Sequence, residues 1–321
     1  MLLTIAFCTW NRSLLLRRTL EQMTRLFIPD GISFELLVVN NNSTDTTDEV
    51  IESFSTTLPI RYLFEPKTGK SHACNRAVRN AHGEYILWTD DDVLVDRNWL
   101  ASYADAFVQY PEAAFFGGPI MPWFEGLPPA WLNQTLPEII SVFGMIDFGR
   151  RSFSITAKTS LPFGANFAVR TLEQLRHPFD PSLGPRGNRR VAGGETDMLE
   201  RMVEAGLSGR WVPDARVKHY IPKALQTTRF IRKYFYAFAQ GEGRRGLRLH
   251  DVAVPMLFGA PRYLWRQAVS AEIKYRIRRY LSDPNVWIKD LKSSVLTFGI
   301  ISSYQARQKA SRRLLNSKWH N

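Results

Sequence analysis

Apolar and polar positions alternate in blocks along the first 120 residues, as in chains where strands and helices follow one another. Short, almost continuously apolar runs predict buried strands at 3–8, 34–39, 60–64, 85–89 and 114–120. Between them, helical periodicity and capping residues predict helices at 14–26, 46–54, 70–81 and 97–110, the first capped by Ser13. This alternation predicts an α/β fold, with a parallel sheet and helices on both of its faces.

The rest of the chain is less regular. Residues 121–165 are rich in proline, glycine and aromatic side chains and predict loops, which would form a lid or an acceptor platform. Short strands are predicted at 167–170, 211–212 and 217–219, and a helix at 195–205. From about Gln226 basic and aromatic residues interleave, and this pattern predicts helices of a different character.

Composition narrows the class of protein. Hydrophobic residues make up 45% and charged residues 22% of the 321 residues, which excludes a disordered, collagen-like or purely coiled-coil chain. The two cysteines, Cys8 and Cys74, form no CxxC pair, which excludes a disulfide scaffold and suits a reducing compartment. The most apolar uncharged stretch, 295–304, is too short to span a bilayer, and no secretory signal is expected at the start.

The net charge of +12 is concentrated at one end of the chain. Residues 226–321 carry 19 basic and 5 acidic side chains, a net charge of +14, whereas residues 1–225 are net −2. A basic segment attracts polyanions, either nucleic acid or anionic lipid, although it is also compatible with a solvated helix face. Aromatic side chains interleaved with basic ones are typical of helices that lie on a lipid surface and also of surfaces that bind single-stranded nucleic acid. The segment alone therefore does not decide between these two functions.

An acidic triplet, Asp90-Asp91-Asp92, follows the apolar run 85–88. It therefore lies at the carboxyl end of a predicted strand, where open α/β sheets bind ligands. Three adjacent carboxylates repel one another, and a divalent cation that bridges to phosphate oxygens would offset this repulsion. The alternative is a solvated acidic turn that caps the next helix.

A second strand end carries the segment 40–45, Asn-Asn-Asn-Ser-Thr-Asp. Its short amides and hydroxyls suit the recognition of a base or ribose, and they equally suit a turn. Lys70 follows Gly69 without the glycine spacing of a P-loop, so it is interpreted only as a point charge for a phosphate.

Two further segments carry candidate chemistry. Glu195 and Asp197 follow a glycine pair at a predicted helix start, where a carboxylate is either a cap or a general base. His219 ends a predicted strand and is either structural or a metal ligand.

Taken in order, these segments resemble the family 2 glycosyltransferases of the GT-A fold over about residues 2–225. The segments that carry the resemblance are 4–12, 40–45, 69–77, 90–92, 163–170, 179–180, 195–206 and 213–219. Asn40 stands where the family often has aspartate, and Gly194 where an acid often precedes the base. The resemblance therefore does not name the nucleotide base.

The resemblance implies a GT-A fold, with a Rossmann-like, mostly parallel central sheet flanked by helices, followed by a basic helical C-terminal region. The implied catalytic domain covers 1–225, with a nucleotide-sugar-binding half at about 1–120 and an acceptor and catalytic half at 121–225. Residues 226–321 are expected to form a mainly helical region that associates with a membrane.

The implied activity is metal-dependent, inverting transfer of a sugar from a nucleotide-sugar to a hydroxyl of a glycan or lipid-linked acceptor, in polysaccharide or glycolipid biosynthesis. The expected cofactor is Mn²⁺ or Mg²⁺, since mixed carboxylate and imidazole ligands suit either ion. The expected partners are the donor, the acceptor and an anionic membrane surface, with no nucleic acid. The expected location is the cytoplasm, peripheral on the inner face of the plasma membrane.

The same resemblance implies roles for individual residues. Glu195 is expected to be the catalytic base, with Asp197 as the second candidate. The residues expected to bind the nucleotide-sugar are Thr9, Asn11, Arg12, Asn40, Asn42, Lys70, Asn75, Asp90 and Asp91. Asp92 and His219 are expected to hold the metal, and Gly164, Asn166 and Trp123 to line the acceptor side. Arg244 and Arg245 are candidates for contact with the diphosphate.

Two other functions remain open at this stage. One is a module that binds a nucleotide-sugar or glycan with little catalysis, because the base position is atypical. The other is a nucleic-acid-binding protein that uses its basic end, although such a protein is expected to have a basic main domain too. The negative net charge of residues 1–225 disfavours the second reading.

Overall fold

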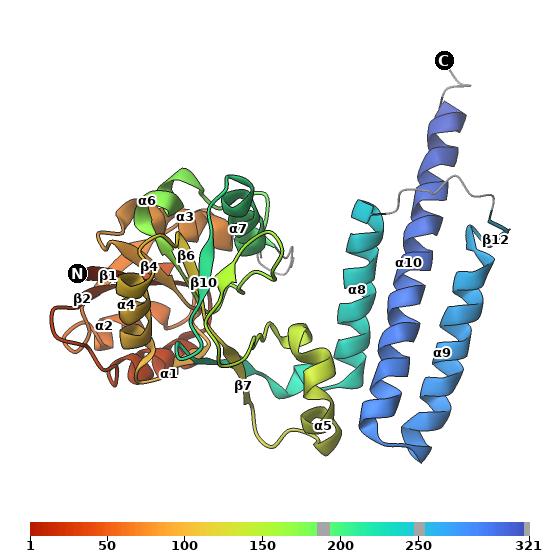
Figure 1. Ribbon diagram of the computed structural model, residues 1–321, viewed down its shortest axis with the longest axis horizontal. Helices are drawn as coiled ribbons and strands as arrows, with labels where there is room; N and C mark the ends of the chain where they lie inside the picture. The colour runs from red at the N-terminus through yellow and green to blue at the C-terminus, as the bar shows by residue number, and fades with distance from the viewer. Residues whose placement is uncertain (185–192, 247–253, 318–321) are drawn as a thin grey trace. The chain divides into compact units, whose positions relative to one another are not determined.

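The computed structural model describes residues 1–184, 193–246 and 254–317, with 241–246 and 310–317 as backbone only (Figure 1). The chain divides into two compact units. The first, here called the α/β unit, comprises Met1–Trp123 and Gly144–Tyr220, and the second, the helical unit, comprises Phe124–Phe143 and Ile221–Asn321. The segment 124–143 therefore belongs with the C-terminal helices, whereas the sequence pattern alone places it with the preceding domain.

The α/β unit is built on an eight-stranded sheet of order β3-β2-β1-β4-β9-β6-β10-β8. The strands are β1 Leu2–Thr9, β2 Ser33–Asn40, β3 Ile60–Phe64, β4 Tyr85–Trp88, β6 Phe115–Gly117, β8 Ser154–Ile155, β9 Phe167–Arg170 and β10 Gly209–Trp211. The pairs β1–β2, β1–β4, β2–β3 and β6–β10 are parallel, while β9 runs antiparallel between β4 and β6. The prediction of an α/β fold with a mostly parallel central sheet is confirmed.

Six helices accompany this sheet in the described part of the unit (Figure 1). They are α1 Ser13–Met23, α2 Thr47–Ser53, α3 Lys70–Asn80, α4 Trp99–Gln109, α6 Thr171–Arg176 and α7 Gly194–Glu204. The apolar face predicted for the first helix comprises Leu16, Leu20, Met23 and Phe27. The first three are buried, whereas Phe27 lies beyond the end of α1 and is exposed, so the prediction for Phe27 is wrong. Burial of each of the first three side chains stabilises the fold by about 1.5–3 kcal/mol.

Ser13 is the first residue of α1 and does not cap it, so this prediction is wrong. Its backbone N–H donates to Asp45 Oδ2 at 3.0 Å, and Asp45 lies in the loop after β2. A carboxylate at a helix N-terminus satisfies an unpaired N–H and interacts favourably with the helix dipole. This helix start is therefore stabilised by a residue distant in sequence, which local capping rules do not consider.

A second, three-stranded sheet of order β5-β11-β7 lies beside the acidic triplet. Its strands are β5 Val93–Val95, β11 Val217–Ile221 and β7 Ile120–Phe124. The predicted strand at 114–120 is two strands, β6 and β7, which belong to different sheets. The break falls at Gly118, where a Cβ atom would lie 2.1 Å from the carbonyl oxygen of Ala215, so the backbone passes too closely for any side chain.

The prediction of loops over 121–165 is wrong in part. This segment contains the end of β7, helix α5 Ala130–Ile139, the 3-10 turn η1 Ile140–Phe143 and strand β8. Pro137 lies inside α5 and disguises the helix in the sequence pattern, because proline normally ends a helix. Burial of Leu132 and Ile139 maintains the helix despite that cost.

The helical unit contains three long helices, α8 Thr228–Gly246, α9 Arg262–Leu281 and α10 Pro284–Ser317 (Figure 1). A 3-10 turn, η2 Lys223–Leu225, precedes α8, and a hairpin of β12 Met256–Leu257 and β13 Ala260–Pro261 precedes α9. Both α8 and α9 pack on α10. No helix in the described ranges combines the length and the apolar character needed to cross a bilayer.

Candidate functional site

The candidate site lies where β1, β2 and β4 reach the same edge of the sheet. Thr9 of β1 is in register with Asn40 of β2, and Ala6 of β1 with Trp88 of β4, so the loops that follow are neighbours. Asn11 joins two of these loops, because its Oδ1 accepts from Thr44 N at 2.7 Å. Asn11 and Asn42 adopt left-handed backbone angles, φ 52° and 66°, which asparagine tolerates better than most residues.

The three carboxylates of the acidic triplet point to different partners. Asp90 Oδ1 lies 2.7 Å from Lys70 Nζ, while Arg12 Nη1 lies 3.0 Å from Asp91 Oδ1 and 2.7 Å from Asp92 Oδ2. The sequence pattern predicts that a metal ion offsets the repulsion among these carboxylates. In the structure, two cationic side chains offset it instead. Arg12 and Lys70 are among the residues predicted to bind the donor, and the structure brings both to this edge.

Burial sets the electrostatics of the triplet. It raises the pKa of Asp91 to about 6, against the charge of Arg12 and with the help of neighbouring Asp92. Burial also disfavours the ionised form of Asp92, but the interaction with His219 and the charge of Arg12 lower its pKa to about 2. The charge of Asp91 raises the pKa of Arg12 above its ordinary value. Asp92 is thus held more firmly as an anion than Asp91.

His219 reaches Asp92 through the second sheet. It is paired in register with Val93 of β5, the residue after Asp92, and its Nε2 lies 3.5 Å from Asp92 Oδ1. Two ligand atoms at right angles on one ion, each about 2.1 Å from it, lie about 3 Å apart, so this pair fits a shared divalent cation. Asp92 Oδ1 is buried and accepts no hydrogen bond from the described residues. The same is true of Thr9 Oγ1 and Thr89 Oγ1.

The pair does not form a complete protein cage. Within the described residues, no group of three or more His, Cys, Asp or Glu side chains is arranged to hold an ion. Among the described residues, Asp92 and His219 therefore supply two ligands of an open site.

Glu195 lies in the first turn of α7 and joins the same cluster. Its Oε1 lies 2.8 Å from Lys70 Nζ, so Lys70 links Glu195 to Asp90. Burial disfavours the charge of Glu195, but Lys70 outweighs it and lowers the pKa of this carboxyl below its ordinary value. Gly164 leaves room for the side chain, because a Cβ atom at that position would lie 2.6 Å from Glu195 Oε1.

Asp197, the second candidate base, is engaged elsewhere. Its Oδ2 accepts from Arg201 Nε at 3.0 Å, one turn further along α7, and Arg201 also donates to the carbonyl of Pro178. The contact with Lys70 distinguishes Glu195 from Asp197. The structure brings Glu195, and not Asp197, into contact with the cationic side chains of the sheet edge.

Several predicted donor-binding side chains are occupied by the protein itself. Asn40 is buried, with Nδ2 donating to Asp48 at 2.6 Å and Oδ1 accepting from Ser43 N at 2.9 Å. Asn75 bonds to both backbone groups of Phe179, through Nδ2 at 2.8 Å and Oδ1 at 2.9 Å. These amides shape the loop after β2 and attach the segment around Phe179 to α3.

Asn166 is completely buried, and four hydrogen bonds occupy its side chain. Its Oδ1 accepts from Trp99 Nε1 at 2.8 Å and from the Tyr103 hydroxyl at 2.9 Å. Its Nδ2 donates to the carbonyls of Pro119 at 2.9 Å and Ala215 at 2.7 Å. Asn166 therefore connects α4 to the segments that lead into β7 and β11, beneath the site.

Asn166→Ala should lower the free energy of unfolding by about 3–5 kcal/mol, because it removes four buried hydrogen bonds and leaves three of the partner groups unpaired, while the Pro119 carbonyl still accepts from Val217 N–H. Urea unfolding followed by circular dichroism measures the change, with Asn133→Ala as the control, because Asn133 is exposed and has an ordinary helical backbone angle in α5; this control should change the free energy by about 0.5 kcal/mol or less. A loss below about 1 kcal/mol for Asn166→Ala would contradict this structural role.

Trp123, in β7, contacts the site through its neighbours. Its ring meets Tyr220 edge-on with centroids 5.0 Å apart, and the guanidinium of Arg18 lies 5.7 Å from its centroid. Tyr220 N–H in turn donates to the backbone oxygen of Asp92 at 2.9 Å. The side chains of Arg244 and Arg245 lie outside the described residues.

The sequence pattern does not identify the small pocket beneath Lys70 and Glu195. Cys8, Cys74 and Thr89 contribute to its lining, and its volume of about 10 Å³ is close to that of a single water probe. The two sulfur atoms lie 3.6 Å apart, and the contact with Cys74 and burial raise the pKa of Cys8. Cys8 and Thr89 could have been predicted as site residues from the sequence, because both lie at the carboxyl ends of predicted strands.

Fold and site together define an α/β enzyme of the GT-A type, with charged side chains gathered at the carboxyl edge of its sheet. The model of the family described as Glycosyl transferase family 2 matches residues 4–171, more than half of the chain. The chain belongs to this family and is a glycosyltransferase.

Individual relatives agree with this assignment. The succinoglycan biosynthesis protein ExoM of Rhizobium meliloti (strain 1021) is 24% identical over 247 residues, covering 75% of this chain and 74% of ExoM. The glucosyl-dolichyl phosphate glucuronosyltransferase of Haloferax volcanii is 20% identical over 274 residues, covering 84% of this chain and 81% of that protein. Among solved structures, the mannosyltransferase PcManGT from Pyrobaculum calidifontis in complex with GDP-Man and Mn²⁺ has a TM-score of 0.59 at 18% identity. That match covers 94% of this chain and 86% of PcManGT, and it supports the GT-A fold.

Proposed function

We propose that this glycosyltransferase moves a sugar from a nucleotide-sugar to a hydroxyl of a glycan or lipid-linked acceptor, with inversion at the anomeric carbon and with a divalent cation. The observation that carries the proposal is the chain of contacts from Glu195 through Lys70 to Asp90, beside the pair Asp92 and His219. This arrangement places a candidate base, Glu195, at the same edge of the sheet as a cationic side chain and a candidate metal site, both of which could bind a diphosphate.

The donor would bind along the loops after β1, β2 and β4. Arg12 and Lys70 are the cations available to the diphosphate, and both are now paired with carboxylates of the triplet. A phosphate that approaches them competes with those carboxylates, because charge-assisted hydrogen bonds to either acceptor are similar in strength. Asp90 and Asp91 then become available to sugar or ribose hydroxyls. Thr9, Asn11 and Asn42 lie in or beside the same loops.

Asp92 and His219 would hold the cation, and the donor diphosphate and water would complete its ligands. Mixed oxygen and nitrogen ligation suits Mn²⁺ at least as well as Mg²⁺, and PcManGT is described with Mn²⁺. When bound, such an ion neutralises negative charge that develops on a leaving diphosphate.

Glu195 would act as the general base that takes the proton of the attacking hydroxyl in a single displacement. Its lowered pKa keeps it ionised at neutral pH, as a base requires. Lys70 is paired with Oε1 of Glu195 in this structure. When Lys70 binds the diphosphate instead, Oε1 becomes free to accept the proton. Gly164, where a side chain would collide with the carboxylate, and Trp123 would border the acceptor.

The acceptor would be part of a surface polysaccharide or a glycolipid. This proposal follows the names of the two relatives, a succinoglycan biosynthesis protein and a glucosyl-dolichyl phosphate glucuronosyltransferase. The helical unit, with most of the basic side chains of the net +14 segment, would rest on the anionic inner face of the plasma membrane, with the enzyme on the cytoplasmic side.

A thermal-shift screen of nucleoside diphosphates with and without Mn²⁺ tests the proposal, because a ligand that binds only the folded state raises its apparent stability. One diphosphate should stabilise the chain, more strongly with Mn²⁺, and the matching nucleotide-sugar should be slowly hydrolysed. Binding without any turnover would indicate a nucleotide-sugar-binding module. Absence of any shift, with salt-sensitive binding of single-stranded DNA, would indicate a nucleic-acid-binding protein.

A further inference from the structure

A groove in the helical unit, outside the catalytic site, gathers positive charge. It has a volume of about 740 Å³ and lies between α8 and α9, the two helices that pack on α10. Its lining combines the first two turns of α8 with the C-terminal half of α9 and consists of Thr228, Arg229, Arg232, Lys233, Glu272, Tyr275, Arg276, Arg279 and Tyr280. Five of these side chains are cationic and one is anionic, so the lining has a net charge of +4.

Glu272 organises two of the cations at the base of the groove. Its carboxylate accepts from Arg232 at 3.1 Å, from Arg276 at 3.0 Å and from Ser294 of α10 at 2.9 Å. Burial disfavours its charge, but these hydrogen bonds lower its pKa below the ordinary value. The guanidinium of Arg232 also lies 5.5 Å from the centroid of Tyr275. The arginines are therefore held in place before any ligand arrives.

Within the described residues, the other three cations of the lining have no carboxylate partner. Arg229, Lys233 and Arg279 form no ion pair with any residue in the described part of the chain. Arg229 and Lys233 lie in the first two turns of α8, where the helix dipole also favours an anion. Arginine forks and lysine point charges beside tyrosine hydroxyls are the groups that recognise phosphate.

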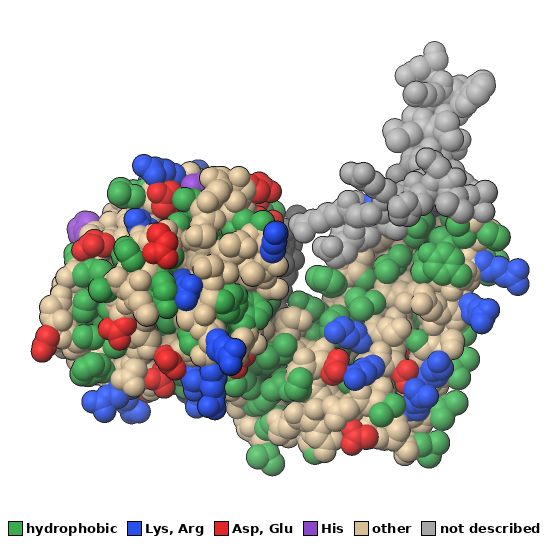
Figure 2. All heavy atoms as spheres, in the orientation of Figure 1, with side chains coloured by type: hydrophobic (Ala, Val, Ile, Leu, Met, Phe, Trp, Pro, Cys, Tyr) green, Lys and Arg blue, Asp and Glu red, His purple; other side chains and the backbone are tan. Residues whose placement is uncertain are grey.

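The outer face of α9 beside this groove is apolar. Val269, Ile273 and Ile277 repeat at intervals of four residues and are 46%, 53% and 54% exposed, and Tyr280 follows at 79%. The helix buries a different set against α10, namely Leu264, Ala268, Ala271 and Tyr275. Figure 2 shows hydrophobic and basic side chains side by side on the visible face of the helical unit. An exposed apolar stripe flanked by cations is the pattern of a helix that lies in a lipid interface.

We propose that the α8–α9 groove binds the phosphate of a membrane lipid, with the stripe of Val269, Ile273 and Ile277 against its hydrocarbon chains. The apolar stripe is the observation that favours a lipid over a soluble phosphate. The inference deepens the membrane part of the proposed function and rests on it. Its test measures lipid binding without sugar transfer, so it can fail while the catalytic proposal stands.

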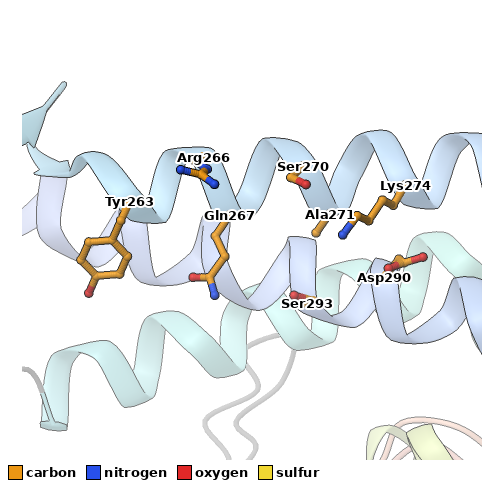
Figure 3. A pocket seen from close by; sticks show the side chains of 8 residues that line it. All are labelled: Tyr263, Arg266, Gln267, Ser270, Ala271, Lys274, Asp290 and Ser293. Atoms are coloured by element: carbon orange, nitrogen blue, oxygen red, sulfur yellow. The ribbon is translucent and has the colours of Figure 1, made fainter.

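A second groove on α9 provides the matched control. Figure 3 shows its lining, with Arg266 and Lys274 on α9 and Asp290 on α10 among the side chains. Its lining has a net charge of only +1, and Asp290 is paired with Arg278 at 3.1 Å. Removing Arg266 and Lys274 changes the net charge of the chain as much as removing two cations from the α8–α9 groove.

The test is flotation of the full chain with phosphatidylcholine vesicles that contain or lack phosphatidic acid. The wild type should bind only the vesicles with phosphatidic acid. The double variant Arg229→Gln/Arg279→Gln should bind them at least about 30-fold more weakly, because each arginine loses a charge-assisted hydrogen bond to the lipid phosphate in addition to its general attraction to the anionic surface. The control Arg266→Gln/Lys274→Gln should lose clearly less, and Ile273→Gln/Ile277→Gln should also weaken binding.

Three results would overturn the inference. Equal losses for the two charge variants would show that general attraction, and not the groove, drives binding. Equal binding of both kinds of vesicle would exclude recognition of the exposed phosphate. Binding of inorganic pyrophosphate by the wild type, without binding to vesicles, would make the groove a site for soluble phosphate. Unchanged thermal unfolding of each variant excludes misfolding as the cause of a loss.

Discussion

Glu195→Gln should lower kcat for sugar transfer by about 10²- to 10⁴-fold, the usual contribution of a positioned general base. Glutamine keeps the size of the side chain and one acceptor oxygen, but it cannot take a proton at neutral pH. Donor binding, measured by the thermal shift with the matching nucleoside diphosphate, should persist. Because Lys70 lowers the pKa of Glu195 below its ordinary value in the free enzyme, kcat/KM of the wild type should lose this base only at a pH more acidic than an ordinary glutamate would require.

Two further variants test whether Glu195 or Asp197 is the general base. Asp197→Asn removes the other carboxylate of the same helical turn, which is paired with Arg201, and should change kcat by less than about tenfold. Gly164→Ala places a methyl group 2.6 Å from the present position of Glu195 Oε1 and should lower kcat by up to about 10²-fold through displacement of the base. If Asp197→Asn abolishes transfer and Glu195→Gln does not, the base is Asp197.

Asp92→Asn should abolish the stimulation of transfer by Mn²⁺ and lower kcat by about 10²-fold or more, since metal stabilisation of developing charge is worth several kcal/mol. The variant replaces the carboxylate whose pKa is held at about 2 by a neutral amide of the same size. Binding of Mn²⁺ in the presence of the nucleoside diphosphate, followed by electron paramagnetic resonance, should weaken in parallel. Chelation of the metal in the wild type should reproduce the loss.

The matched control for Asp92→Asn is Asp214→Asn. Asp214 is a highly exposed carboxylate, 79% accessible, in the loop that leads to β11 and His219. Its replacement should leave both Mn²⁺ binding and kcat within about twofold of the wild type. Full activity of Asp92→Asn, with or without added Mn²⁺, would contradict a metal role for the pair of Asp92 and His219.

Most of the α/β unit is predictable from the sequence. The strands β1 to β4 and the helices α1 to α4 fall where apolar runs and helical periodicity place them, with ends that differ by a few residues. The position of the acidic triplet at a strand end follows from the same patterns. Short elements such as β5, β8 and α6 escape prediction because three or fewer alternations, or a single turn, carry little periodic signal.

The roles of individual side chains are less predictable. The repulsion within Asp90–Asp92 is evident from the sequence, but Arg12 and Lys70 offset it in the structure. Asn166 matches a family motif, yet all its hydrogen-bonding capacity serves the core. The exposed apolar stripe of α9 is also hidden in the sequence, because apolar residues on two faces of one helix cancel the amphipathic signal.

The sequence by itself determines the order of strands and helices, the class of fold and the loops that carry the polar segments, because these depend on neighbouring residues and on how parallel strands connect. Only the tertiary structure decides that Lys70 joins Asp90 to Glu195, that His219 faces Asp92 and that residues 124–143 pack with the C-terminal helices. The physical reason is that contacts between distant residues depend on strand register and on packing, which local patterns do not contain.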